Sequence, residues 1–289
     1  MAEIISILIV GALISAVYAL IAIGFSLIFG VGSVLNLAHG ALLMVGAYVF
    51  LYTSEDVTPV GGLLLAILAT ALVSYLIYRG AVRYIEHNMV TTFLVTLTIA
   101  LILEELAIIQ FSSEPASLEP IVSGATVVLG NRVTYNQIFG FVVSWASLGA
   151  VWYYVTRTQR GRATLALAMS EKGAKYTGVN IGRVRAETWL LAGGLAGLGG
   201  VFLGATIETS PTMWLDPLVI AFIIVVVGGL GSIKGSIVGA YLIGYLETIA
   251  VELGGPQFRS ITALIVLVVI MLYRPQGLFG RELIEESGE

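Results

Sequence analysis

Ionisable side chains in or beside apolar stretches are the residues of this 289-residue chain that could do chemistry. They are His39, Glu104, Glu105, Glu208, Asp216 and Glu247. A charge at the centre of a bilayer costs at least about 2.5–3.5 kcal/mol, so such groups usually face protein or water. Glu247 lies well inside its apolar stretch, whereas the other acids lie nearer the ends. Two interpretations of Glu247 remain open: a structural hydrogen-bond partner, or a member of a proton relay.

Catalytic, metal and nucleotide sites are not predicted. The chain has no cysteine, which excludes disulfides, thiolate zinc sites and cysteine nucleophiles. His39 has no second ligand at metal spacing, and Gly231–Gly235 does not supply the phosphate-loop pattern. We therefore expect no catalytic residue, no metal, no cofactor and no enzyme activity of this chain itself.

The elements that position these residues must be membrane helices. Hydrophobic residues make up 58% of the chain and charged residues 11%, whereas soluble domains carry roughly 25% charged residues. Lipid is the solvent that suits this composition. The apolar run from Ile4 to Phe29 follows no basic residue and exceeds a signal-peptide core, so we interpret it as a retained helix. The predicted fold is an all-α polytopic membrane protein, a single transmembrane domain over residues 1–289.

Nine apolar stretches approach the length that crosses a bilayer, which is about 20 residues for a core of about 30 Å. They are Ile4–Phe29, Leu35–Tyr52, Val60–Tyr78, Val90–Phe111, Gln137–Val155, Thr188–Ile207, Pro217–Leu230, Gly235–Leu253 and Ser260–Tyr273. We expect about nine transmembrane helices, within a range of eight to ten. The second stretch begins with polar residues and the seventh is short, so broken or re-entrant segments are expected there.

The basic residues predict the orientation, because Lys and Arg gather in cytoplasmic loops. Half of the 14 basic residues lie in the loop over residues 157–186, namely Arg157, Arg160, Arg162, Lys172, Lys175, Arg183 and Arg185. This loop, the 79–88 loop and the tail with Arg274 and Arg281 are predicted to be cytoplasmic. The 54–58 turn, the 112–135 loop and the N-terminus are then outside.

Two kinds of glycine spacing occur. Gly193, Gly197, Gly200 and Gly204 share one helix face, which is typical of close helix packing in lipid. Clusters at Gly30–Ser33 and Val227–Gly235 instead indicate helix breaks or turns. Broken helices often line substrate pathways in transporters. The candidate pathway or helix-break residues are Asn36, His39, Gly40, Gly228, Gly229 and Gly231. A simple turn at the membrane surface remains the alternative.

The loop over residues 157–186 is too long and too polar for a simple connection. Small apolar and charged residues over Gly161–Thr177 predict a short helix, which Gly178–Asn180 would stop. One interpretation is a helix lying on anionic lipid. The other is a docking helix that seats in a partner's groove.

Five motifs follow one another along the chain. They are Ser15–Gly24, Leu35–Gly40, Gly178–Asn180, Val227–Gly235 and Arg274–Gly280. In this order the chain resembles, over essentially its whole length, the permease subunits of branched-chain amino-acid ABC importers of bacteria and archaea. Leu37 stands where an aromatic residue is usual, and Lys234 where proline is common. These two departures leave the resemblance intact.

The resemblance implies that this chain is one subunit of a transporter with several different subunits. Two permease subunits, identical or related, would form the pathway across a prokaryotic plasma (inner) membrane. Two cytoplasmic ATPase subunits would bind ATP and Mg, and an extracytoplasmic binding protein would deliver the substrate. The ATPase-coupling residues would be Ala168, Met169, Ser170, Glu171, Lys172, Gly173, Ala174, Tyr176 and Gly178. The implied function is ATP-driven import of branched-chain or other hydrophobic amino acids.

Other functions remain open beside this one. Permease motifs identify the fold of the subunit more than its substrate. Urea, a short amide or another small solute is therefore an alternative substrate. An ion-coupled secondary transporter would predict inverted repeats and paired intramembrane acids. No repeat is evident, and Glu247 stands alone in its stretch. A purely structural scaffold would leave the large basic loop unexplained.

Overall fold

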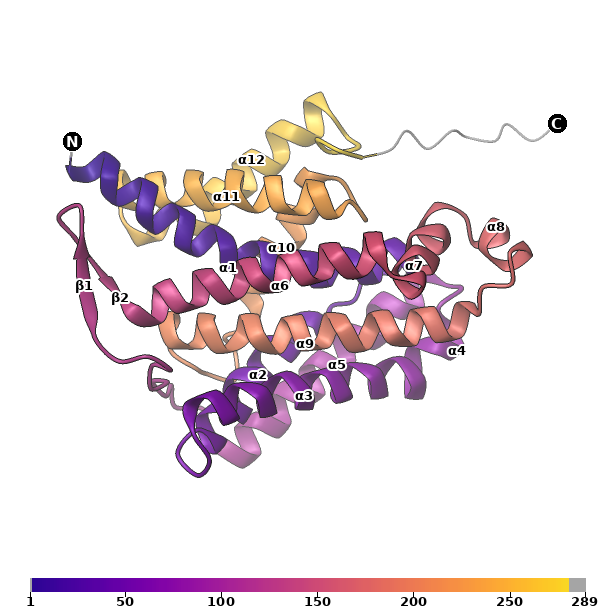
Figure 1. Cartoon of the computed structure of the whole chain (residues 1–289), viewed down its shortest axis with the longest axis horizontal. Coiled ribbons are helices and arrows are strands. Elements are labelled where there is room, and N and C mark those ends of the chain that lie inside the picture. The colour runs from indigo at the N-terminus through magenta and orange to yellow at the C-terminus, as the bar shows by residue number, and fades with distance from the viewer. Residues whose placement is uncertain (1, 281–289) are drawn as a thin grey trace.

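The computed structural model describes residues 2–280, and it is almost entirely helical (Figure 1). Arg281, which contributes to the predicted orientation of the tail, lies outside the described residues. The elements in chain order are α1 (Ala2–Gly32), α2 (Ala38–Thr53), α3 (Pro59–Ile77), the π-helix η1 (Tyr78–Val82), α4 (Arg83–Ile85), α5 (Met89–Phe111), β1 (Ala125–Val128), β2 (Asn131–Thr134), α6 (Tyr135–Arg157), α7 (Gln159–Met169), α8 (Glu171–Tyr176), α9 (Ile181–Ile207), α10 (Leu215–Gly228), α11 (Ile233–Gly254), the 3-10 turn η2 (Pro256–Phe258) and α12 (Arg259–Tyr273).

Seven helical segments within the described residues are long and apolar enough to cross a membrane. They include α1, α5, α6, α9 and α11, together with α3 continued through η1 and α4, and α12 with its preceding turn. Two further apolar helices, α2 and α10, have 16 and 14 residues. At about 1.5 Å per residue these two fall short of a core of about 30 Å. The chain is thus an all-α polytopic membrane protein with seven full-length candidate spans and two shorter apolar helices, both of which adjoin a predicted break.

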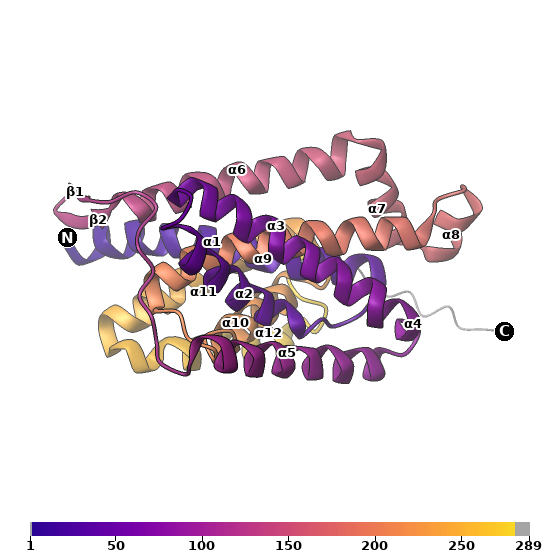
Figure 2. The ribbon, with the colours of Figure 1, turned by 90° about the horizontal axis from the view of Figure 1, so that it is seen from below.

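The long helices lie side by side between two distinct ends. Figures 1 and 2 place the β1–β2 hairpin (residues 125–134) at one end and α8 (residues 171–176) at the other. We call these the hairpin end and the α8 end. The beginning of α1 and the turn between α2 and α3 lie at the hairpin end, whereas η1 and α4 lie toward the α8 end (Figure 1). The two loops predicted to be cytoplasmic therefore share one end of the bundle.

The hairpin is an addition to the predicted all-α fold. Its strands pair antiparallel, with Val128 opposite Asn131. Leu129 and Gly130 form the turn with φ of 51° and 90°, and positive φ at both central residues matches the right-handed twist of a tight hairpin. These residues were predicted as plain loop, because a two-residue turn without Asn-Gly or Asp-Gly gives little local signal.

Helix α9 is the most buried of the candidate spans, and it packs against α1, α2 and α3. Its glycines lie at these contacts. A Cβ at Gly193 would lie 2.6 Å from the Thr70 carbonyl of α3, and one at Gly200 would overlap the main chain of Leu43 in α2. Such close approach supplies van der Waals packing, which lipid-embedded helices need because the hydrophobic effect gives no drive between them.

Candidate functional site

The first helix break lies between α1 and α2. Gly30 and Gly32 are still helical, and the break instead occupies residues 33–37, starting with Ser33 at φ 50°. Thr96 of α5 supports it, because the Leu37 amide donates to the Thr96 hydroxyl at 3.2 Å and the Leu35 carbonyl lies 3.4 Å from the same oxygen. Non-helical backbone within a membrane persists where protein buries it. The non-helical segment therefore begins at Ser33, the last residue of the predicted cluster, and continues to Leu37.

Asn36 and His39 lie buried at this break. The His39 Nε2 atom is 3.2 Å from the Ile21 carbonyl of α1, and its ring meets the Phe25 ring edge-on. The side-chain oxygen and nitrogen of Asn36 are both buried and have no hydrogen-bond partner among residues 2–280. Buried polar atoms are normally paired. His39 therefore packs against α1, whereas Asn36 keeps an unsatisfied amide at the break. Gly40 lets α10 approach, because a Cβ there would lie 2.8 Å from the Leu218 Cβ.

The second break joins α10 to α11. Gly229 and Gly231 have φ of 105° and 77°, conformations that favour glycine. The Ser232 side chain then accepts from the Gly235 amide at 3.0 Å and begins α11. Lys234, the departure from the common proline, is exposed and lies 5.5 Å from the centre of the Trp152 ring. That contact is a cation–π interaction with α6.

The C-terminal motif completes the second break. The amides of Leu278 and Phe279 donate to the carbonyls of Val227 and Gly228 at 2.8 and 2.9 Å. These carbonyls belong to the last turn of α10, which has no intrahelical donors for them. Arg274–Gly280 thus caps α10 from a distance of about fifty residues in sequence, a role that the motif alone did not reveal.

The two breaks and the long loop meet at the α8 end. A Cβ at Gly30 would lie 3.6 Å from Gly231 and 3.9 Å from the Cβ of Ala168. The end of α1 therefore contacts the second break on one side and α7 on the other. Sequence reasoning did not join these three segments, because they are far apart along the chain.

The long loop contains two helices, so the prediction of one helix over Gly161–Thr177 is wrong in this respect. Ser170, at φ −161° and ψ 119°, separates α7 from α8. Its side chain accepts from the Gly173 amide at 3.0 Å and starts α8. Gly178, at φ 78°, follows the end of α8. Asn180 then caps α9 through a 3.0 Å bond from the Arg183 amide, so Arg183 and Arg185 belong to α9 and not to the loop.

Of the residues assigned to ATPase coupling, Ala174 is buried. It forms a small apolar cluster with Val31, Leu167 and Val184, which attaches the loop to α1 and α9. The other assigned positions are exposed: Ala168, Met169, Ser170, Glu171, Lys172, Gly173, Tyr176 and Gly178. Met169 and Tyr176 are 69% and 88% exposed. The α8 end thus exposes two large apolar side chains, with Lys172 and Lys175 between them in sequence, on a loop held by its own small core.

Glu247 is enclosed by two partners. The Tyr18 hydroxyl of α1 donates to its Oε1 atom at 3.1 Å, and the Arg259 Nε atom lies 2.8 Å from the same oxygen. A buried carboxylate held by a phenol and a guanidinium fits the structural interpretation of this residue. Arg259 was missed because it begins the last helix, 12 positions beyond Glu247. Glu104 similarly accepts from the Trp214 indole at 2.8 Å and joins α5 to the start of α10.

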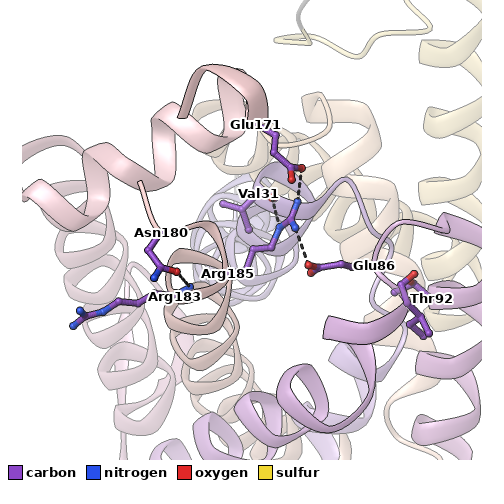
Figure 3. Close-up of polar contacts among 8 residues, drawn as sticks. Val31, Glu86, Thr92, Glu171, Asn180, Arg183 and Arg185 are labelled. Atoms are coloured by element: carbon purple, nitrogen blue, oxygen red, sulfur yellow. Dashed lines mark hydrogen bonds and ion pairs between the residues drawn. The ribbon is translucent and has the colours of Figure 1, made fainter. Parts of the chain in front are cut away.

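Arg185 is the functional candidate that sequence reasoning overlooked. Its side chain is 8% exposed and contacts three separate segments (Figure 3). The Nε atom donates to the Val31 carbonyl at 3.1 Å, and the Nη1 and Nη2 atoms donate to Glu86 and Glu171 at 2.8 and 2.7 Å. In the sequence, Arg185 is one of seven basic residues of the loop predicted over residues 157–186. Neither carboxylate is near it in sequence, so no local signal marks the cluster.

Seven apolar candidate spans, two shorter apolar helices beside non-helical segments and a helical loop at the α8 end define the class as a polytopic membrane protein. The family described as the branched-chain amino acid transport system permease component matches residues 7–273. The chain belongs to this family, as the sequence motifs predicted.

Curated relatives agree with the family over most of the chain. The high-affinity branched-chain amino acid transport system permease protein BraD of Pseudomonas aeruginosa is 26% identical over 293 residues, 96% of this chain and 95% of that protein. LivH of Escherichia coli, of the same description, is 25% identical over the same shares. The ribose import permease protein RbsC of Escherichia coli is 27% identical over 132 residues, 43% of this chain and 41% of that protein. No solved structure matches the chain.

Proposed function

We propose that this chain is the transmembrane permease subunit of an ABC importer that moves branched-chain amino acids, or other hydrophobic amino acids, into the cytoplasm. The observation that carries the proposal is the family match over residues 7–273, which spans both helix breaks and the whole loop with α7 and α8. Membership of this family implies ATPase and binding-protein partners. ATP and Mg would bind to the partner ATPases, and the permease itself would need no cofactor.

The proposed assembly pairs this subunit with a second permease chain, identical or related. The whole chain forms one permease domain in the inner membrane of a prokaryote. Helices α2 and α10 complete about nine membrane segments, with the breaks beside them as candidate parts of the pathway. The positive-inside rule supports a cytoplasmic α8 end, because the basic loops gather there. The N-terminus is then outside and the C-terminus is cytoplasmic.

Coupling is proposed to pass through α7 and α8. Met169 and Tyr176 are exposed apolar side chains that would fit a partner's groove, with Lys172 and Lys175 between them in sequence to pair with charges at its rim. The cluster around Ala174 attaches the loop to α1 and α9. Closure of the ATPase subunits would therefore move helices as bodies and not merely bend a loop.

A different small solute is the alternative substrate of the same scaffold. RbsC, described as a ribose import permease, matches nearly half of the chain. Part of the chain is thus similar to a permease named for a different solute, and an importer of urea, a short amide or another small solute is the second candidate because a scaffold does not fix its substrate.

The test is uptake of labelled leucine into proteoliposomes. They would contain this chain with its co-encoded permease and ATPases, with ATP enclosed in the lumen and the binding protein outside. We expect ATP-dependent uptake that excess valine and isoleucine block, while urea and polar amino acids do not. ATP-dependent uptake of urea alone would keep the architecture and change the substrate. Uptake that follows an ion gradient without the ATPases would reject the proposal.

A further inference from the structure

The Arg185 cluster is built as a three-way junction. Arg185 lies one turn into α9, and its guanidinium reaches the end of α1, the end of α4 and the start of α8 (Figure 3). Burying a guanidinium is costly unless its donors are paired. Each of its three donor nitrogens has one acceptor, at 3.1, 2.8 and 2.7 Å. Arg can do this because its planar fork holds several donors in fixed directions, which a lysine ammonium cannot.

The three acceptors differ in how firmly they are held. The Val31 carbonyl belongs to the last turn of α1, where helical carbonyls lack intrahelical donors and attract positive charge. The Glu86 side chain is 11% exposed, whereas that of Glu171 is 53% exposed. Arg185 is therefore held on α1 and α4 by buried contacts, and its 2.7 Å contact with Glu171 is the more exposed one through which α8 is attached.

The contact between Arg185 and the Val31 carbonyl lies next to the first helix break. Val31 lies two residues before Ser33, where the first break begins. The same α8 that holds Glu171 also carries Ala174, which packs on Val31 in the apolar cluster. Polar and apolar contacts thus join α8 to the end of α1 at one point, directly beside the non-helical segment that ends at Leu37.

We infer that Arg185 is a positioning residue that makes α8, the start of α9 and the end of α1 one rigid body, so that movement of α8 displaces the first helix break. This inference rests on the proposed function, because it assumes that ATPase subunits move α8. It adds that the force reaches the break through Glu171, Arg185 and the Val31 carbonyl. Without the guanidinium, the apolar cluster around Ala174 alone would join α8 to the end of α1, and α8 would move partly independently of it.

Distance measurements test the rigid body directly. The chain has no cysteine, so spin labels at Ser33→Cys and Lys172→Cys, both exposed positions, report the separation of α1 and α8. The full importer would be measured without nucleotide and with ATP trapped by vanadate. In the parent we expect the same distance in both states. In Arg185→Lys, which keeps the charge but loses the fork, we expect the distance to change or broaden on trapping. One unchanged distance in both chains would overturn the inference.

Coupling efficiency provides the second readout. We expect Glu171→Gln and Arg185→Lys each to lower the number of leucine molecules imported per ATP hydrolysed by about fivefold or more, the lower range of typical coupling. The double variant should be no worse than the more severe single one, because both act through one contact. The matched control is Glu55→Gln, which changes an exposed carboxylate in the turn between α2 and α3 that forms no ion pair within residues 2–280, and it should leave the ratio unchanged. Uptake and hydrolysis that fall together at a constant ratio would contradict the inference.

Different results would reject the proposed function and the proposed role of Arg185. If the parent importer shows no ATP-dependent uptake, the proposed function is rejected, and the label distances still decide whether Arg185 holds α8 to α1. If the parent transports normally and Arg185→Lys transports at the parental ratio, the function stands and the role of Arg185 is rejected.

Discussion

The hydroxyl of Tyr18 on α1 donates a hydrogen bond of 3.1 Å to Glu247 on α11, 229 positions further along the chain. The carboxylate also pairs with Arg259 at 2.8 Å, so three helices meet at one buried acid. We expect Tyr18→Phe to destabilise the protein by about 1 kcal/mol, since interhelical hydrogen bonds in membranes average about 0.6 kcal/mol and reach about 1.7. Thermal unfolding of the purified chain in detergent measures this.

The proton-relay interpretation of Glu247 makes a different prediction. If the acid is structural, Glu247→Gln should keep ATP-driven uptake at a comparable rate, because glutamine still accepts from Tyr18. Uptake should also be indifferent to an imposed proton gradient. Loss of uptake in Glu247→Gln with an unchanged melting temperature would favour the relay.

Close helix packing predicts a contrast between two glycines. A Cβ at Gly200 would overlap the main chain of Leu43, whereas one at Gly149 meets nothing within 4 Å. Gly200→Ala should destabilise the fold by about 1–3 kcal/mol, as overpacking does. Gly149→Ala is the matched control and should be neutral or slightly stabilising, because alanine favours the helix. Equal melting temperatures for the two variants would contradict the α2–α9 contact.

The cap on α10 predicts a local opening. Gly277 has φ 78°, and a Cβ there would lie 2.5 Å from the Val226 carbonyl. Gly277→Ala should therefore loosen the pairing of Leu278 and Phe279 with the end of α10. Hydrogen exchange of a peptide containing these amides should become faster, while exchange in α9 stays unchanged. Gly182→Ala, at an exposed position with a normal backbone, is the control.

Replacing Asn36 by an apolar residue is expected to increase stability and to decrease transport. Its amide is buried and has no partner in the described part of the chain. Asn36→Leu should raise the free energy of unfolding by about 1 kcal/mol, because a buried unpaired polar group costs about 1–3 kcal/mol. Uptake should fall if the amide serves the pathway. Asn136→Leu is the control that should destabilise, since the Asn136 oxygen accepts from the Ile121 amide at 3.1 Å.

If the ATPase subunit docks on α8, exposed Tyr176 should contribute to binding, whereas exposed Tyr84 should not. Tyr176 is 88% exposed on α8, and Tyr84 is 73% exposed on α4 toward the same end. Tyr176→Ala should weaken binding of the ATPase subunit by about tenfold or more, the range of an interface hot spot. Tyr84→Ala should bind normally. Binding to the permease in nanodiscs measures both, and equal affinities would place the docking surface elsewhere.

Much of the helical scaffold follows from the sequence alone, because its signals are local. Apolar runs mark every long helix, and side-chain caps such as Asn180 and Ser232 act within three residues. The glycine face of α9 is a fixed spacing on one helix. The family motifs likewise act as ordered local patterns, and the family match agrees with them.

Tertiary structure alone decided the contacts that join remote segments. In the sequence, Arg185 looks like an ordinary charged residue of a loop. In the structure, α9 begins at Ile181, and the Arg185 guanidinium is buried between Glu86 and Glu171, which lie 99 and 14 positions away. The pairing of Arg259 with Glu247 and the cap of Leu278 on α10 are equally invisible in sequence. Such contacts depend on which helices pack together. The spacing of small and apolar residues predicts which face of a helix is buried, but it does not predict which neighbouring helix covers that face.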